Sequence, residues 1–264
     1  MTSSTTPAPP TEATAKPDLT GAFTMPAVSP LAGPPPYRYR DCTAVNIVFR
    51  TDPAALEGLV PAPLQVDPDQ PCVLYVGHFE FADFNLPYNE AGLLVPVARE
   101  GKPVGSFAVV LYLDTANPIV GGREVYGWPK KDADQIVLEQ HEGHLSAQVI
   151  RYGIRIIRVT LDPGPRVEPI PQRTPSPIHF LKLIPSIQEG APPDVLKLNA
   201  MVIEPDVITD LRPGRGTLEF GDSPYDGFLA RIPVLGIMYS EVIVHDFTLG
   251  FGEVVVDYLA SGRP

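Results

Sequence analysis

Proline limits what this chain can fold into more than any other feature of its sequence. The 264 residues contain 33 prolines, and these are spread along the whole length. A proline inside an α-helix removes a backbone hydrogen bond and clashes with the preceding turn, so few long helices can form here. Between the prolines lie short runs rich in Val, Ile, Phe and Tyr, and such runs are typical of β-strands.

The strand-like runs begin near Tyr37 and are separated by Gly and Pro at intervals that suit strands joined by turns. The sequence shows no alternation of strand and helix patterns and no glycine-rich phosphate loop, so a nucleotide-binding Rossmann domain is not expected. We predict a mainly β, or β-rich α+β, fold: an antiparallel sheet or barrel with few short helices. The runs cover residues 44–50, 72–81, 106–114, 135–140, 145–161, 196–204, 216–221 and 232–259.

Two short segments favour a helix. In TDPAALEGLV, residues 51–60, Asp52 can cap a helix and Pro53 suits its first position. The second segment covers Ile178–Leu183, and Pro185 keeps it short.

The first 36 residues differ in composition from the rest of the chain. They hold nine prolines among Ser, Thr and Ala. Such a segment cannot bury enough apolar surface to offset the entropy lost on ordering. We predict a disordered tail over residues 1–36 and one folded domain over residues 37–264.

Composition also indicates the cellular setting. No run of about 18 apolar residues is present, and the N-terminus lacks the apolar core of a secretory signal. Two cysteines, Cys42 and Cys72, are too few for a disulfide scaffold. We therefore expect a cytoplasmic protein with no membrane partner.

The formal net charge of −11 argues against a nucleic-acid partner and means that an anionic substrate needs a local basic site. The five histidines do not form a cluster of metal ligands. His141 and His144 lie three residues apart, but Gly143 between them indicates a turn, so we expect no metal site.

The lysine pair in GREVYGWPKK, residues 122–131, is the most unusual local feature. A lysine with a pKa of about 10.4 is almost wholly protonated at pH 7, so a nucleophilic lysine needs a pKa lower by roughly three, or about 4 kcal/mol. Burial in an apolar pocket can supply this, and a neighbouring cation can add to it. If Lys130 and Lys131 lie on an extended chain, their side chains leave on opposite faces, so burial is the larger cause.

The segment around the lysine pair resembles the signature of the acetoacetate decarboxylase family, in which Gly-Arg-Glu precedes an aromatic residue, Pro and Lys-Lys. Other segments resemble that family in the same order along the chain. The resemblance extends over about residues 37–260 and leaves the proline-rich tail outside. The further segments are residues 46–67, 88–97 with Tyr-Asn-Glu-Ala-Gly, 180–186 and 252–260.

The resemblance implies a sheet closed into a cone or barrel, a homo-oligomer and a small keto acid as substrate. It implies that Lys130 forms a Schiff base with a β-keto acid, which then loses CO₂. Because lysine is the covalent catalyst, no cofactor is implied, neither a metal nor pyridoxal phosphate.

The remaining candidate residues follow from the same resemblance. Lys131 and Glu90 join Lys130 as catalytic candidates, with Glu90 orienting the substrate or moving protons. The candidates for substrate binding or support are Arg123, Glu124, Tyr126 and Trp128, of which Arg123 and Glu124 are interpreted as bracing the loop.

The chain departs from the family pattern at two positions. The active-site arginine of the family falls at Cys42, with Arg38 and Arg40 close by. The second pocket glutamate falls at Val76 or Gly77, and Glu80 is the nearest acid.

Two alternatives stay open, and the departures from the family pattern favour the first of them. One is a Schiff-base aldolase-dehydratase that joins a keto acid to an aldehyde. The other is a small-ligand-binding β-barrel without catalytic activity.

Overall fold

The computed structural model describes residues 19, 21–83, 87–171 and 173–260. The chain divides into two compact units, residues 1–34 and 35–264. In the first unit, the described residues form turns and bends without helix or strand. Residues 1–18 and 20 lie outside the described ones, so disorder of the tail stays a prediction.

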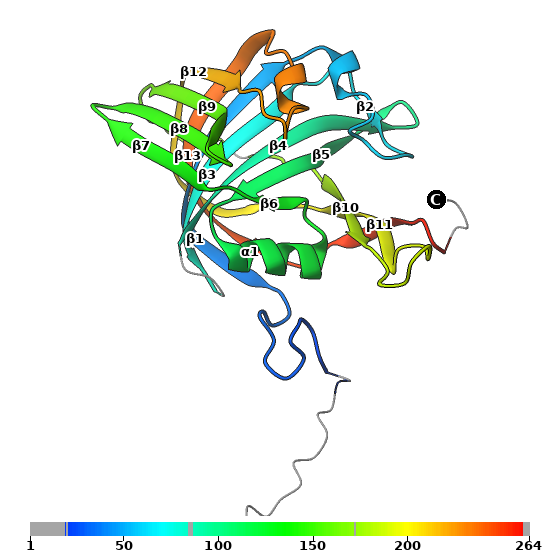
Figure 1. The fold of residues 1–264 in the computed structure, drawn as a ribbon. Coiled ribbons are helices and arrows are strands. Elements are labelled where there is room, and N and C mark those ends of the chain that lie inside the picture. The colour runs from blue at the N-terminus through cyan, green and yellow to red at the C-terminus, as the bar shows by residue number, and fades with distance from the viewer. Residues whose placement is uncertain (1–18, 20, 84–86, 172, 261–264) are drawn as a thin grey trace, which may run out of the picture. The chain divides into compact units, whose positions relative to one another are not determined.

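The second unit is one mixed β-sheet that curls strongly (Figure 1), which confirms the predicted β-rich fold with few short helices. The sheet path runs from β14 to β7 without closing, so the sheet is curled and open rather than a closed barrel. In spatial order the strands are β14, β11, β10, β5, β4, β3, β1, β13, β12, β9, β8 and β7, with β2 beside β4 and β6 beside β5.

The pairings are antiparallel except for β10 with β5 and β5 with β6, which are parallel. The strand bounds are β1 Tyr37–Arg50, β2 Gln65–Val66, β3 Cys72–Ala82, β4 Tyr88–Arg99, β5 Lys102–Leu113, β6 Lys130–Asp132, β7 Gln135–His141, β8 His144–Arg151, β9 Ile154–Pro163, β10 Ile178–Ile184, β11 Val195–Met201, β12 Pro205–Phe220, β13 Gly236–Leu249 and β14 Glu253–Asp257.

Helical structure is confined to short turns. The 3₁₀-helix η1 (Pro53–Leu56) lies at the predicted position, and Asp52 Oδ1 accepts from Ala54 N at 3.0 Å. The α-helix α1 (Ala116–Gly121) continues into the π-helical turn η2 (Gly122–Tyr126), and η3 (Leu229–Arg231) is a single 3₁₀ turn. Among the described residues, no helix is long and apolar enough to cross a membrane.

The helix predicted at Ile178–Leu183 is wrong, because this segment forms strand β10. It pairs along its whole length with β11, with Phe180 opposite Asn199 and Leu181 opposite Leu198. The ladder hydrogen bonds of β11 outweigh the weak local helix preference of a segment this short.

Alternation along the strands gives the sheet two different faces. On β1, Val45, Ile47 and Phe49 pack into the larger apolar core, whereas Ala44 and Asn46 face a cavity on the other side. The period of two in each strand thus assigns one set of residues to stability and the other to the cavity.

A buried ionic network ties β5, β6 and β8 to the loop before η3. Asp226, which is 1% exposed, accepts from Tyr112 Oη at 2.9 Å, Lys131 Nζ at 2.5 Å and Arg151 Nη1 at 2.9 Å. Burial opposes ionisation of Asp226, but the hydrogen bonds from Lys131 and Tyr112 outweigh it, so the pKa of Asp226 lies below its usual value.

We predict that Asp226→Asn lowers the free energy of unfolding near pH 7 by about 3–5 kcal/mol, because Arg151 would stay buried without its carboxylate. The stabilisation is present above the ordinary aspartate pKa of about 3.9 and is lost as the pH falls through the lower folded value. Urea unfolding followed by circular dichroism should therefore show a difference in free energy of unfolding between wild type and Asp226→Asn that becomes smaller as the pH is lowered.

Asp162→Asn is the matched control, because the Asp162 side chain is exposed and pairs with His144 at the surface. It should cost less than about 1 kcal/mol. Equal decreases in the free energy of unfolding of the two variants would contradict the role assigned to Asp226.

Candidate active site

A cavity of about 280 Å³ opens on the face of the sheet opposite the larger core. Most of its lining is apolar or aromatic, including Tyr75, Phe79, Leu111, Trp128 and Ile243. A few polar side chains converge among them, which is the usual make-up of a small-molecule site. These polar residues are Asn46, Glu90, Lys130, Arg173 and His245.

Lys130 reaches this cavity because β6 pairs with β5 in parallel, with Lys130 opposite Leu111 on the cavity face. Lys130 is 8% exposed, and its Nζ lies 2.9 Å from Glu90 Oε2 and 5.9 Å from the centre of the Tyr88 ring. Glu90 Oε2 has no hydrogen-bond partner among the described residues, so its contact with Lys130 Nζ is an ion pair by distance and not a hydrogen bond.

Gly122 makes room for the lysine side chain. A Cβ at this position would lie 2.7 Å from both Cδ and Cε of Lys130, closer than real Cβ contacts allow. The backbone of Gly122 is right-handed helical, so this glycine is required by space and not by conformation. The Gly-Arg-Glu signature therefore begins with a residue that clears the path of Lys130.

The π-helical turn is closed by Gly127, whose φ is 92°. Gly127 N and Trp128 N both donate to Gly122 O, at 3.0 and 3.1 Å. Lys182 Nζ on β10 donates to the carbonyls of Glu124 and Val125 at 2.6 and 2.9 Å. These bonds fix the chain reversal that delivers the lysine pair to the edge of β5.

Glu90 on β4 is 5% exposed. Its other carboxylate oxygen, Oε1, accepts a hydrogen bond from Tyr75 Oη at 2.5 Å. Burial, followed by the charge of Glu90, raises the pKa of the Tyr75 hydroxyl, so this group stays protonated and serves as a donor. A Cβ at Gly92 would lie 2.3 Å from the Tyr75 ring, so Gly92 allows that ring to cross β4. Tyr75 was not predicted from the sequence.

Lys131 leaves on the opposite face, next to Tyr112, and binds Asp226 in the network described above. The two lysines therefore do not share a pocket. This separation agrees with the alternation expected of an extended chain and leaves burial as the feature that distinguishes Lys130.

The other candidates from the signature surround the lysine without all reaching the cavity. Arg123 Nη1 donates to Lys130 O at 3.1 Å, and Glu124 offers its carbonyl to Lys182. Tyr126 is buried and its Oη donates to Gly250 O at 3.0 Å. Of this group only Trp128 lines the cavity, with its ring centre 4.0 Å from that of Phe180.

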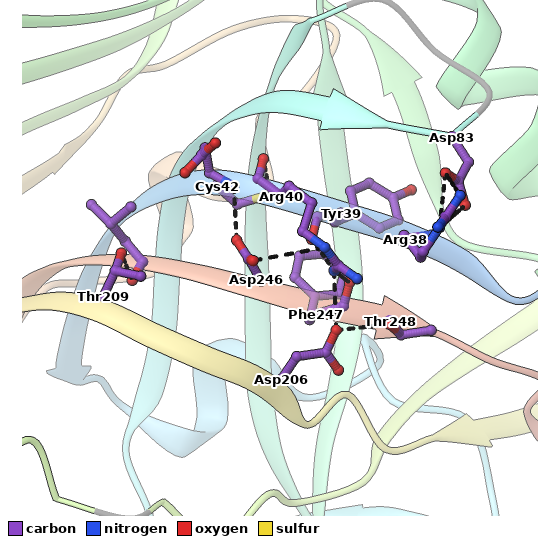
Figure 2. Close-up of polar contacts among 12 residues, drawn as sticks. Arg38, Tyr39, Arg40, Cys42, Asp83, Asp206, Thr209, Asp246, Phe247 and Thr248 are labelled. Atoms are coloured by element: carbon purple, nitrogen blue, oxygen red, sulfur yellow. Dashed lines mark hydrogen bonds and ion pairs between the residues drawn. The ribbon is translucent and has the colours of Figure 1, made fainter.

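The arginines near Cys42 do not line the cavity. Figure 2 shows Arg38 paired with Asp83, and Arg40 paired with Asp206 and Asp246. Cys42 is buried, and burial raises the pKa of its thiol to about 12, so the thiolate is not available as a nucleophile.

The position of the second family glutamate is also without an acid. Val76 packs in the larger core, and a Cβ at Gly77 would touch the Phe79 ring. Glu80 is exposed and pairs with His78 at 2.8 Å. The hydroxyl nearest Glu90 instead comes from Tyr75.

Arg173, which the sequence analysis missed, is a second cationic side chain in the cavity lining. It lies on the segment between β9 and β10, and its guanidinium pairs with Glu241 on β13. No local pattern marks Arg173, because it occurs in a proline-rich connection far from the lysine pair.

Among the described residues, no group of three His, Cys, Asp or Glu side chains is placed to hold a metal ion.

Strand register places Lys130, Tyr75, Asn46 and Glu241 in one row of residues across the sheet. Each residue is the direct partner of the next across neighbouring strands β6, β5, β4, β3, β1 and β13. The row begins at the amine of Lys130 and ends at Glu241, the carboxylate that binds Arg173 of the cavity lining. In order, its members are Lys130, Leu111, Gly92, Tyr75, Asn46 and Glu241.

The chain is similar to known proteins over most of its length. The family model for acetoacetate decarboxylase matches residues 24–259. An acetoacetate decarboxylase of Ralstonia nicotianae is 35% identical over 246 residues, which cover 91% of this chain and 96% of that relative.

Solved structures show the same fold. Acetoacetate decarboxylase from Legionella pneumophila has a TM-score of 0.79 at 26% identity, over 94% of this chain and 100% of that one. A second solved structure is the enduracididine biosynthesis enzyme MppR, complexed with the condensation product of pyruvate and imidazole 4-carboxaldehyde. It has a TM-score of 0.75 at 20% identity, over 92% of this chain and 99% of that one. At this identity the similarity is one of fold alone. From the family match and the 35% identity, the chain belongs to the acetoacetate decarboxylase family.

Proposed function

We propose that this protein decarboxylates a β-keto acid, acetoacetate or a longer analogue, to a ketone and CO₂ through a Schiff base on Lys130. The observation that carries the proposal is the buried lysine whose Nζ lies 2.9 Å from Glu90 in a cavity with mostly apolar walls. Family membership supports the same activity.

In the first half of the reaction, the free amine of Lys130 adds to the ketone carbon and forms a carbinolamine. Glu90 is close enough to take a proton from the amine and to return one to the departing oxygen, which leaves as water. The product is a protonated iminium. Tyr75 holds the Glu90 carboxyl in place through its hydrogen bond to Oε1.

In the second half, the bond to the carboxylate breaks and its electron pair moves to the iminium nitrogen. CO₂ leaves, and an enamine remains. Apolar walls such as Trp128 and Leu111 favour neutral CO₂ over a charged carboxylate. Protonation of the enamine carbon and addition of water then release the ketone and restore the amine.

The alternative within the fold is an aldolase-dehydratase that uses the same enamine to attack an aldehyde. Cys42 at the position of the family arginine, and the absence of an acid at Val76 and Gly77, favour this alternative. The neighbour MppR is described with a condensation product of pyruvate and an aldehyde. Release of CO₂ from acetoacetate supports decarboxylation, whereas inactivity there with turnover of pyruvate and an aldehyde supports the alternative. A ligand-binding protein without activity would form no covalent adduct with either keto acid.

We also propose that the protein is a cytoplasmic homo-oligomer. Among the strands that the structure describes, β14 and β7 stand at the two ends of the sheet path, and end strands of a sheet can pair with a second copy of the chain. Cys42 and Cys72 are both free thiols and buried, which suits a reducing compartment.

The Schiff base predicts a borohydride-reduced adduct on Lys130 after incubation with acetoacetate, located by intact mass and peptide mapping. Lys130→Arg should abolish both the adduct and turnover. Lys131→Arg should retain much of the activity, because Lys131 binds Asp226 on the other face. An adduct on Lys131, or no adduct on folded protein, would contradict the assignment.

Gly122→Ala should slow adduct formation by at least tenfold, because the new Cβ would occupy the space of Lys130 Cδ and Cε. The measurement is the rate of trapping with acetoacetate and borohydride. Gly236→Ala is the matched control, since a Cβ there meets nothing within 4 Å. If both variants trap at the wild-type rate, Gly122 does not shape the site.

Tyr75→Phe should lower kcat by about tenfold while leaving the adduct on Lys130 detectable, since it removes one hydrogen bond to the Glu90 carboxyl. Because Tyr75 positions Glu90, the pH dependence of kcat should shift with it. A variant with unchanged kcat and pH profile would show that Tyr75 only packs.

A further inference from the structure

The far end of the cavity carries a guanidinium held in a fixed position. Arg173 Nη1 donates to Glu241 Oε1 at 2.8 Å, and Nη2 donates to Oε2 of the same carboxylate. This two-pronged contact fixes the plane of the guanidinium as well as its position. Such precision on a connecting segment indicates that the orientation of Arg173 matters.

Glu241 acts as the holder of Arg173. It is 1% exposed, and it also accepts from Asn46 Nδ2 at 2.9 Å and from Tyr239 Oη at 2.9 Å. Both of its oxygens are therefore occupied. A guanidinium has five N–H donors, and Glu241 takes two of them, so donors remain for a ligand.

His245 provides a second, independent sign of a ligand at this end. It lines the cavity, and its Nδ1 is buried with no hydrogen-bond partner in the part of the chain that the structure describes. Burial lowers the pKa of His245, so its ring is neutral at pH 7. A buried polar atom without a protein partner is expected to find one in a bound water or a ligand.

The two charged pairs of the cavity are carried by strands that are not neighbours in the sheet. Lys130 Nζ meets Glu90 on β4, whereas Arg173 meets Glu241 on β13, with β3 and β1 between them. Three strand spacings of about 4.8 Å separate these strands by about 14 Å along the sheet. Acetoacetate has one carbon beyond its ketone and would leave the Arg173 end empty.

The space between the two ends suits a hydrocarbon chain. Phe79, Leu94, Ile178 and Ile243 are among the mostly apolar residues that line the cavity. A tail that crosses this section would bury its methylene groups against apolar side chains, at a gain of about 0.8 kcal/mol per group.

Resting on the Schiff-base function, we propose that the preferred substrate is a longer β-keto acid whose apolar tail ends in an oxygen acceptor. Lys130 takes the reacting ketone, the tail crosses the apolar section, and Arg173 donates to the terminal oxygen. The acceptor is a carbonyl-type oxygen, from either a ketone or a carboxylate.

The test compares three eight-carbon β-keto acids that end in a methyl group, a methyl ketone or a carboxylate, with acetoacetate as reference. Wild-type kcat/KM should favour at least one oxygen-terminated acid over the methyl-terminated one by about 10–100-fold, as expected for a hydrogen bond to a charged donor. The better of the two oxygen-terminated acids identifies the type of acceptor.

Arg173→Met should bring the ratio between the oxygen-terminated and methyl-terminated acids close to one. The single change Arg173→Met would leave the buried Glu241 carboxylate without its cation. The double variant Arg173→Met/Glu241→Gln avoids this, because both side chains are then neutral, and its kcat/KM ratio is measured in the same way. Arg166→Met is the matched control, since Arg166 lies on the same connection and pairs with Glu168 at the surface. It should keep the wild-type ratio.

The inference is overturned if wild type shows no preference for an oxygen-terminated tail, or if the preference survives loss of Arg173. It is also overturned if acetoacetate is the better substrate by kcat/KM. None of these outcomes contradicts the proposed Schiff-base function, provided that acetoacetate is turned over and trapped on Lys130. Failure of every keto acid to form an adduct would instead refute the proposed function itself.

Discussion

The parallel pairing of β6 with β5 is the constraint on which the whole site depends. Three residues of β6 sit beside Leu111, Tyr112 and Leu113, and this register sends Lys130 to the cavity and Lys131 to the core side. A shift by one residue would exchange the two lysines. The register is held by the Lys131–Asp226 contact on one face and by Arg123, which binds the carbonyl of Lys130. Residues that never touch the cavity thus decide which amine enters it.

The same alternation organises the charges of the protein. Each basic side chain in the cavity lining lies beside one carboxylate: the buried Lys130 lies beside Glu90, and Arg173, whose side chain is 36% exposed, lies beside Glu241. Pairing limits the cost of burying these charges, which would be several kcal/mol for an isolated ion. It also means that the cavity carries little net charge within a chain of net charge −11. Binding of a keto acid therefore depends on local donors and apolar contact more than on long-range attraction.

Much of the fold could be read from the sequence because its signals are local. Proline spacing and β-branched runs predicted a sheet with few helices, and Asp52 with Pro53 marked the turn η1 correctly. The segment Ile178–Leu183 was misjudged, since its strand state comes from pairing with β11, which no local pattern reveals. The helix α1 and its π-helical extension were also missed, because Pro118 and the glycines that follow resemble a loop.

The candidate site could likewise be predicted only in part from the sequence. Lys130 and Trp128 were predicted from one contiguous signature and Glu90 from the separate segment 88–97, and the structure brings all three to one cavity. Tyr75, Arg173 and Glu241 come from three distant segments, and only the strand register unites them. Cys42 indicated that an arginine was missing from the first strand. Nothing in the sequence indicated that another arginine lines the cavity from the β9–β10 connection.

The most direct test of the central claim follows the ketone oxygen. In the Schiff-base reaction this oxygen leaves as water when the iminium forms, and a solvent oxygen replaces it on hydrolysis. Acetoacetate turned over in ¹⁸O-labelled water, and sampled faster than the uncatalysed exchange, should give acetone carrying the label at the level of the solvent. Acetone that keeps the original oxygen would contradict a covalent role for Lys130.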